Sequence, residues 1–521
     1  MKNKNILSLP LVALAFVAAP VYAVDGIAAQ GDNQQTPQPE QPVASAMEDN
    51  EEAYDPDQIV VTADVVRGAV DTEIPPIQEL KEADILAYGA SSLTDLLAAL
   101  APQTGSGRGR GDGQPVILLN GQRISGFREL RDLPPEAVKQ VQIFPEEVAL
   151  KYGYRADQRV INIILKDNFA SYIAEAQYGA PQQGGFSHQE LESRLTRIGK
   201  KTRLNISMEY EAQSRLTEDE RDIISTTSGL PRSILGNITG LLPDGTIDPA
   251  LGTAKQAAIP AGIDNPTLAQ FIANANALND TGIGRYRSLL PKTERYEVNT
   301  TWSTSLGTVS SLSLNANYQL DGSSSLLGLA GASFTLPATS PYSPFSQDVT
   351  INRYFTQPRA LERESETHTA NFSATFNSFI GKFRWTVTGD YSHVENETKT
   401  NRNVDFAALQ AGVANGSINP FASNFGKDLL FLAPDLSNSL TQNINLRSTL
   451  SGSLITLPAG DVQATFTTGF TRQMLDSESW RSGITTATNL NRNQLIGSVN
   501  GSMIGAEGGE TRQRKACAHV V

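Results

Sequence analysis

The sequence predicts a mixed α/β domain followed by an antiparallel transmembrane β-barrel. Three observations support this prediction. Polar and apolar residues alternate from about Ala170 onward, short glycine turns alternate with very long connections, and residues 1–23 have the pattern of an export signal. In the segment 202–213, every second residue is apolar from Leu204 to Ala212, and the residues between are polar. A period of two sends the two sets to opposite faces of a strand, which is typical of a wall between lipid and a hydrated lumen.

The predicted wall has about ten strands of roughly ten residues each. They are expected near 170–179, 189–198, 202–214, 295–306, 310–320, 367–379, 383–394, 440–455, 462–472 and 494–504. Short turns are expected at 199–201, 307–309, 380–382 and 459–461, and long polar connections at 216–294, 321–365 and 397–439. Short turns on one rim and long loops on the other are typical of an outer-membrane barrel. A soluble β-sandwich or solenoid is the alternative, since its strands also alternate, but sandwiches rarely separate loop lengths so strictly.

Composition argues against several classes of function. The formal net charge is −13 and the sequence pI is about 5.0, and no basic patch with interleaved aromatics appears, so a nucleic-acid partner is not expected. The single cysteine, Cys517, excludes an internal disulfide framework and a cysteine-based metal site. The mean hydropathy is only −0.26, as expected where every second residue of a wall is polar.

The chain shows no plausible catalytic or metal-binding constellation. Four histidines are scattered without metal-ligand spacing: His188, His368, His393 and His519. Acidic pairs at Glu218/Glu220 and Glu364/Glu366 fall in predicted hydrophilic connections, where solvated charges are the simpler interpretation. We therefore expect no cofactor, no metal site and no enzymatic activity.

The first residues predict export and a flexible tether. Residues 1–23 have a charged start, a short apolar run and a small-residue cleavage site ending at Ala23, so a cleaved secretory signal peptide is expected. With a barrel behind it, this signal places the chain in the outer membrane by way of the periplasm. Residues 24–56 are rich in Gln, Pro, Ala and acid, which predicts a disordered periplasmic leader.

The leader ends in a short β-prone segment, residues 57–63. It reads Asp57-Gln58-Ile59-Val60-Val61-Thr62-Ala63. An exposed segment of this kind is suited to pairing with the sheet edge of another protein. The first strand of the following domain is an equally good interpretation of the pattern.

The block 64–166 is predicted to be a compact mixed domain. Ser91 or Ser92 caps a helix that Pro102 ends, with Asp95 in the capping-box position to Ser92. The turn Asn120-Gly121 predicts a hairpin. The remaining elements expected are a turn or short helix at Pro134-Pro135, a strand at 138–143, a helix from Pro145 to about Tyr152 stopped by Gly153, and a buried strand at 160–165.

In order and spacing, these elements resemble the TonB-dependent outer-membrane receptors. The resemblance covers most of 57–166 and is carried by Ile59-Val60-Val61-Thr62-Ala63, the helix 92–100, the hairpin 117–124, Leu133-Pro134 with the strand 138–143, 148–153 and 160–166. It implies that 57–63, from Asp57 to Ala63, is the TonB box handed to the energy-coupling protein of the inner membrane. It also implies that 64–166 is a plug inside a barrel of about 22 strands, begun here by residues 167–504.

The chain departs from the family pattern at several points. Asn120 stands where Asp is commoner, and residues 144–147 and 157–159 replace a Lys-Gly-Pro turn and a Gly-rich approach to the last plug strand. The tail 505–521 loses the alternation and ends at Val521 where family barrels present an aromatic residue. About ten strands are half of the expected wall, so a truncated receptor is the hypothesis. A small closed barrel of ten strands is its rival.

The function expected from these features is energy-coupled uptake of a large scarce nutrient, such as an iron chelate, a vitamin or an oligosaccharide. The expected partners are the TonB-type protein, outer-membrane lipid, the barrel-assembly machinery and that cargo. Arg108 and Arg110, in a glycine-rich loop, are candidate contacts for an anionic ligand, with solvated loop charges as the alternative. Loop aromatics are candidate contacts for sugars or catecholates, or interface anchors: Tyr286, Phe334, Tyr342, Phe345, Tyr354 and Phe355. A surface adhesin or structural barrel without transport is the alternative function.

Overall fold

A computed structural model describes residues 68–504, except 71, 91, 105–114, 125, 155–157, 222, 224–230, 281 and 458–459. Several predicted features lie outside the described residues: the signal peptide, the leader, the TonB-box-like segment 57–63, Arg108 and Arg110, and the tail 505–521. Their assignments stay predictions. Among the described residues, no helix has the length and apolar character needed to cross a membrane.

The N-terminal domain, called the plug below, is built on a five-stranded mixed sheet. Its strands are β1 (Gln78–Lys81), β2 (Val116–Leu119), β3 (Gln122–Arg123), β4 (Val138–Phe144) and β5 (Val160–Leu165), in the order β1-β4-β5-β2-β3. Its helices are α1 (Glu82–Ala87), α2 (Leu93–Thr104), α3 (Arg128–Arg131), η1 (Pro135–Ala137) and α4 (Glu147–Lys151). Every residue of β5 is buried, as its apolar run predicts.

Local signals place most plug elements where the sequence predicts them. The Asp95 N–H donates to Ser92 Oγ at 3.1 Å, as in the expected cap of α2. Asn120 and Gly121 have φ of 50° and 72°, the backbone that an Asn-Gly hairpin turn requires. The prediction that Pro102 ends the helix is wrong, because α2 continues to Thr104. Pro102 lies in the last turn, where its fixed φ suits a helix and its missing N–H removes only one intrahelical bond.

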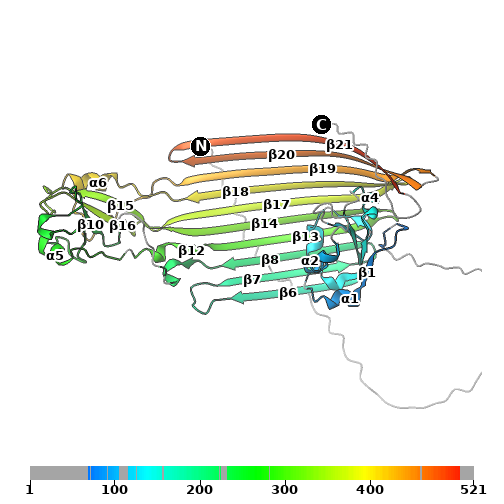
Figure 1. Cartoon of the computed structure of the whole chain (residues 1–521), viewed down its shortest axis with the longest axis horizontal. Coiled ribbons are helices and arrows are strands. Elements are labelled where there is room, and N and C mark those ends of the chain that lie inside the picture. The colour runs from blue at the N-terminus through cyan, green and yellow to red at the C-terminus, as the bar shows by residue number, and fades with distance from the viewer. Residues whose placement is uncertain are drawn as a thin grey trace, which may run out of the picture. The chain divides into compact units, whose positions relative to one another are not determined.

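The second part is a ten-stranded antiparallel sheet, called the wall below (Figure 1). Its strands are β6 (Phe169–Gly179), β7 (His188–Ile198), β8 (Thr202–Gln213), β13 (Lys292–Leu306), β14 (Ser310–Gly328), β17 (Leu361–Ile380), β18 (Phe383–Thr400), β19 (Asp435–Leu457), β20 (Gly460–Arg481) and β21 (Ile484–Ile504). Each of these strands overlaps one of the ten predicted segments, so the predicted wall is confirmed. From β13 onward the strands are longer than predicted.

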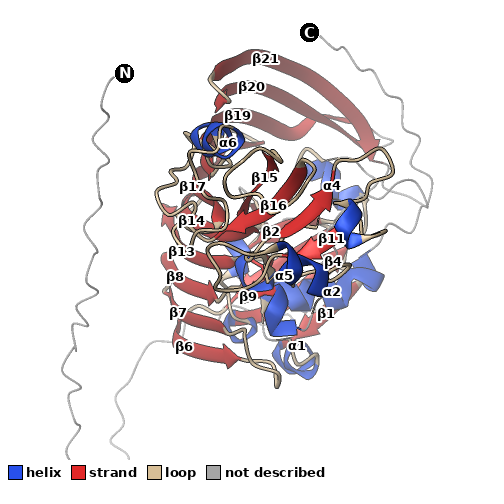
Figure 2. Cartoon of the chain, turned by 90° about the vertical axis from the view of Figure 1, so that its left-hand side faces the viewer, coloured by secondary structure: helices blue, strands red, loops and turns tan. Residues whose placement is uncertain are grey.

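The two faces of the wall differ as predicted. On β13, Asn299 and Thr301 are buried on the face that meets the plug, whereas Val298 and Trp302 are exposed on the other face. Figure 2 shows the plug and the wall side by side. Within the described residues, β6 and β21 each pair with one neighbour and form the two edges of an open sheet. A closed ten-stranded barrel, the rival of a partial wall, is therefore not the arrangement found.

The three long connections, which the sequence predicts as long polar loops, are folded in the parts that the structure describes. They form a unit, called the loop lobe below, that is seen at the left of Figure 1. It contains β10 (Asn237–Gly240), η3 (Pro249–Leu251), β11 (Gln256–Ala258), α5 (Leu268–Ala273), β15 (Ala330–Leu336), β16 (Val349–Phe355) and α6 (Ala407–Ala414). The four strands form one sheet, in the order β11-β10-β16-β15. At its base lie β9 (Leu216–Thr217), η2 (Glu218–Arg221), η4 (Gly284–Tyr286) and β12 (Ser288–Leu290).

The loop lobe has its own hydrophobic core, drawn from all three connections. Phe334, Phe345 and Phe355 are buried in this core, so these three candidate ligand aromatics are core residues instead. Burying these rings contributes hydrophobic free energy, which offsets the conformational entropy that the long connections lose when they become ordered. Glu364 and Glu366 are also corrected, because they lie on β17 and not in a loop.

Asp248 joins two of the connections inside the loop lobe. Its carboxylate accepts from the Ala250 N–H at 2.8 Å, the Ser346 N–H at 2.6 Å and the Ser346 hydroxyl at 2.8 Å. Burial alone would raise the pKa of the Asp248 carboxyl, but these hydrogen bonds outweigh it and hold the pKa below its ordinary value. The stabilisation is therefore present above the ordinary pKa of about 3.9 and is lost as pH falls through the folded pKa.

We expect Asp248→Asn to destabilise the loop lobe by about 1–2 kcal/mol at pH 7, because charge-assisted bonds become neutral ones. The difference in stability between the variant and the unaltered chain should shrink as pH falls through the folded pKa of Asp248, which lies below its ordinary value. Hydrogen exchange of amides in β10 and β16 at pH 7 and at low pH measures both effects. Asp428→Asn, at an exposed position of the same lobe, is the control. An equal loss in that control would contradict the assigned role.

Candidate functional site at the interface of the plug and the wall

The plug segment Arg128–Asp132 carries the charges that meet the wall. Glu129 and Arg203, on α3 and β8, have side chains only 3% and 5% exposed, and Arg203 Nη2 donates to Glu129 Oε1 at 2.8 Å. Ser313 Oγ on β14 donates to the same carboxylate oxygen at 2.5 Å. A buried carboxylate needs such partners, because an unpaired charge away from water is costly.

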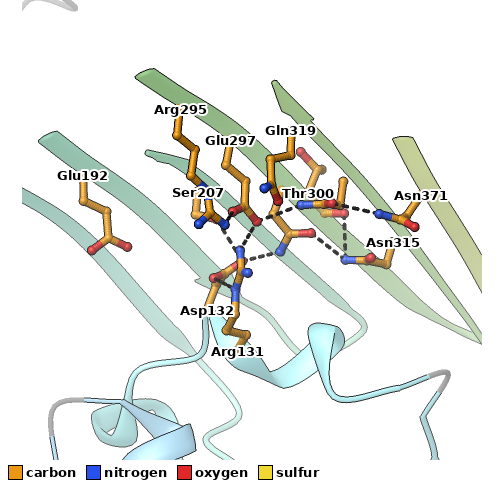
Figure 3. Close-up of polar contacts among 12 residues, drawn as sticks. Arg131, Asp132, Glu192, Ser207, Arg295, Glu297, Thr300, Asn315, Gln319 and Asn371 are labelled. Carbon is orange, nitrogen blue, oxygen red and sulfur yellow. Dashed lines mark hydrogen bonds and ion pairs between the residues drawn. The ribbon is translucent and has the colours of Figure 1, made fainter. Parts of the chain in front are cut away.

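The next two residues of the plug extend this contact to β13 (Figure 3). Arg131 pairs with Glu297, whose other oxygen accepts from Arg295 Nη2 at 2.8 Å. Asp132 Oδ2 accepts from Ser207 Oγ at 2.9 Å and also from Asn299 Nδ2. Both charged side chains of the plug are therefore held by groups on wall strands that lie far from them in sequence.

Amide side chains continue the network across the wall. Asn317 Nδ2 donates to Glu297 Oε1 at 2.9 Å, and Asn371 Nδ2 donates to Asn317 Oδ1 at 3.1 Å. Asn315 Nδ2 donates to Asn299 Oδ1 at 3.0 Å. These asparagines occupy alternate positions of β13, β14 and β17, so the period-two pattern places them on the plug-facing side.

The ion pair of Arg131 stays charged. Burial would lower the pKa of its guanidinium, but the hydrogen bond to Glu297 and the nearby carboxylates of Asp132 and Glu297 raise the pKa above its ordinary value. The Arg131 guanidinium therefore stays charged across the whole physiological pH range.

A cavity of about 230 Å³ lies beside this network. It is lined by Ser92, Thr94, Arg131, Asp132, Glu192, Arg194, Ser207, Glu209, Arg295 and Glu297. Three arginines and four carboxylates give it a mixed polar lining suited to water or to a polar ligand. In the described part of the chain, no group of three or more His, Cys, Asp or Glu residues is arranged to hold a metal ion.

Further contacts hold the plug along the wall. Asn377 Nδ2 donates to the Arg123 carbonyl at 3.1 Å, and Ser451 Oγ donates to the Lys151 carbonyl at 2.9 Å. The Arg384 guanidinium lies 4.6 Å from the centroid of the Tyr152 ring. The contacts described here are thus mainly polar. Of the plug's two hydrophobic clusters, one lies within the plug, and the other includes Ile198 of β7, with Phe169 of β6 packed against it.

None of the site residues predicted from the sequence falls in this network. Asp57, Ile59 to Ala63, Arg108 and Arg110 lie outside the described residues. Sequence reasoning missed Glu129, Arg131 and Asp132 altogether. The available signal was the density of charge in Arg128-Glu129-Leu130-Arg131-Asp132, in a block otherwise dominated by apolar elements.

A comparison with solved protein structures found several that are similar to this chain. One similar structure is that of the ferric preacinetobactin receptor BauA from Acinetobacter baumannii. The aligned region covers 84% of this chain and 62% of the BauA chain, with 12% identity and a TM-score of 0.30. The ferric yersiniabactin uptake receptor FyuA from Yersinia pestis matches 82% over 62%, with 10% identity and a TM-score of 0.34. The RagAB peptide importer matches 83% over 54%, with 10% identity and a TM-score of 0.35. No family model and no curated protein matches the chain.

The chain spans less than two thirds of the length of these three structures. At such identities the similarity concerns the fold alone. The strand order and the contacts between plug and wall, described above, establish that fold within this chain itself. It is the fold of a plug and part of a β-barrel wall. This is the fold that the resemblance to TonB-dependent receptors implied.

Proposed function

We propose that this chain is a TonB-dependent outer-membrane receptor that takes up a large scarce nutrient by energy-coupled movement of its plug. One observation carries the proposal: the plug is held against the polar face of the wall mainly by hydrogen bonds and ion pairs, and its hydrophobic clusters take only Ile198 and Phe169 from the wall. Water can replace such bonds one at a time, so a plug held in this way can move while most of its apolar core stays covered.

The first described residues of the plug indicate where a pulling force would act. Asn162, the one polar residue of β5, is fully buried, and its Nδ2 donates to the Gly68 carbonyl at 2.9 Å. Its Oδ1 accepts from the Gly121 N–H at 2.8 Å. Among the contacts of the described residues, this buried amide is the earliest along the chain that a pull on residues 57–63, five residues before Gly68, would strain. Because Asn162 Oδ1 accepts from the Gly121 N–H, the same amide would transmit the force to the β2–β3 hairpin.

The wall supports an outer-membrane location for the proposed receptor. Its outward face is apolar, and a strand needs only about 9–11 residues to cross a bilayer. The wall strands run from 11 residues in β6 to 23 in β19, so several extend beyond the lipid. Lipid and the barrel-assembly machinery are the partners that such a wall requires. We propose an iron chelate, a vitamin or an oligosaccharide as cargo, with Arg108 and Arg110 as contacts for an anionic one.

Deleting residues 57–63 is expected to abolish energised uptake and leave cargo binding intact. The deletion removes the strand offered to the TonB-type protein but leaves the plug and the wall. The measurement is pull-down of the purified periplasmic domain of a TonB-type protein by the chain in detergent. Accumulation of a radiolabelled ferric siderophore, cobalamin or maltooligosaccharide in cells gives the second readout. A matched deletion of seven leader residues, 34–40, is the control.

The alternative function is a surface adhesin or a structural barrel without transport. Such a protein has no use for a periplasmic segment that pairs with an energy-coupling protein. Equal capture of the TonB-type domain by the two deletion variants would contradict the receptor proposal and favour this alternative.

A further inference from the structure

A second cavity lies between the plug and the end of the wall where the short turns are found. Its volume is about 270 Å³. The plug contributes the β2–β3 hairpin, including Asn120, Gln122 and Arg123, and the wall contributes Lys201 and Arg203 together with parts of the turns at 199–202 and 303–308. Nothing in the proposed transport cycle assigns a role to this cavity.

The charge of the cavity lining is strongly positive. Arg123, Lys201 and Arg203 line it, and Glu129 is the single carboxylate among the lining residues. Glu129 is already bonded by Arg203 Nη2 and by Ser313 Oγ. The cavity beside the first network contains four carboxylates and three arginines. Of these two cavities, only this one has an excess of positive charge.

Buried donors of this lining have no acceptor among the residues that the structure describes. Arg203 has a side chain only 5% exposed, and within that part of the chain neither its Nε nor its Nη1 has a hydrogen-bond partner. Arg123 is also buried, and its Nη1 donates to the Tyr152 carbonyl at 3.0 Å while its Nε has no partner. Leaving guanidinium donors unsatisfied away from bulk water is costly, so an acceptor in the cavity would be strongly favoured.

We propose that this cavity binds a small oxyanion, a phosphate or a carboxylate, between Arg123 of the plug and Arg203 and Lys201 of the wall. Guanidinium groups recognise oxyanions through charge-assisted hydrogen bonds, and buried Arg203 and Arg123 have N–H donors that no described residue accepts. Because the anion contacts both parts, it links the plug to the wall. Binding therefore stabilises the seated plug, by mass action on that state alone.

The test uses the full chain, folded in detergent, and radiolabelled inorganic phosphate in equilibrium dialysis. Saturable binding of one phosphate per chain is expected, with competition by acetate and none by chloride at equal ionic strength. Arg123→Gln should weaken binding by about tenfold, and Lys201→Gln by a few-fold, because each removes one charged donor. Arg203 is left unchanged because Glu129 depends on it.

Lys200→Gln is the matched control, since Lys200 lies in the same turn and does not line the cavity. Its phosphate affinity should equal that of the unaltered chain. Lys201 is exposed, so its variant tests the site without threatening the fold. Absence of saturable binding would overturn the proposal, and so would equal losses in the Lys200 and Lys201 variants. Deletion of residues 57–63 should leave phosphate binding unchanged, which separates this proposal from the transport proposal.

Discussion

Replacing Arg203 with Met should destabilise the seated plug by about 3–5 kcal/mol. The substitution keeps most of the side-chain volume but leaves the Glu129 carboxylate buried beside an apolar group. Only Ser313 would then remain among the wall groups whose hydrogen bonds to Glu129 are described above. Urea titration of the chain in detergent, followed by proteolysis of the exposed plug, measures the loss.

A double variant distinguishes two contributions to stability: the penalty of leaving Glu129 charged and buried without Arg203, and the net stabilisation by the ion pair itself. Glu129→Leu combined with Arg203→Met should recover most of the stability, because well-packed apolar residues often replace a buried ion pair at little cost. Arg194→Met is the control, since Arg194 pairs with Glu192 on the same strand, β7, and not with the plug. A loss in that control as large as in Arg203→Met would show that the pair between plug and wall has no special role.

Replacing Phe334 with Ala should destabilise the loop lobe by about 3–5 kcal/mol. Phe334 is only 1% exposed, and its ring lies 5.3 Å from the ring centroid of Phe425 and 5.9 Å from that of Phe355. These rings come from β15, the third long connection and β16, so the cavity left by Ala would open the contact between separate connections.

Hydrogen exchange distinguishes local from global effects of the Phe334 substitution. Amides of β15 and β16 should lose protection, whereas amides of β13 in the wall should keep theirs. Leu430→Ala is the control within the lobe, because Leu430 is 76% exposed and should change stability by less than about 0.5 kcal/mol. Loss of protection in β13 as well would show that the lobe and the wall unfold as one unit.

The wall was predictable where one face is apolar and the other meets the plug. On β14, the residues from Leu312 to Leu320 alternate strictly, and this part was predicted correctly. The strand continues to Gly328 through Asp321-Gly322-Ser323-Ser324, where the pattern is lost. In this part of β14 neither face of the strand has to be apolar, so the hydrogen-bonded ladder continues without the hydrophobic period that identifies it.

The loop lobe and the ionic contacts could not be predicted in this way. Phe334 and Phe406 come from different long connections, and their rings lie 6.1 Å apart only because three wall hairpins bring those connections together. Arg203 and Glu129 are similarly distant in sequence, and each resembles an ordinary surface charge when taken alone. The sequence around neither residue indicates which residue it pairs with.

Local physical chemistry in the sequence determined the period of the wall strands, the hairpin turn at Asn120-Gly121, the cap at Ser92 and the buried strand β5. Each of these follows from the backbone or from burial within a few residues. Tertiary structure alone decided which charges face one another across the plug and how the long connections share a core. Those contacts depend on distances in space that no period or spacing along a chain encodes.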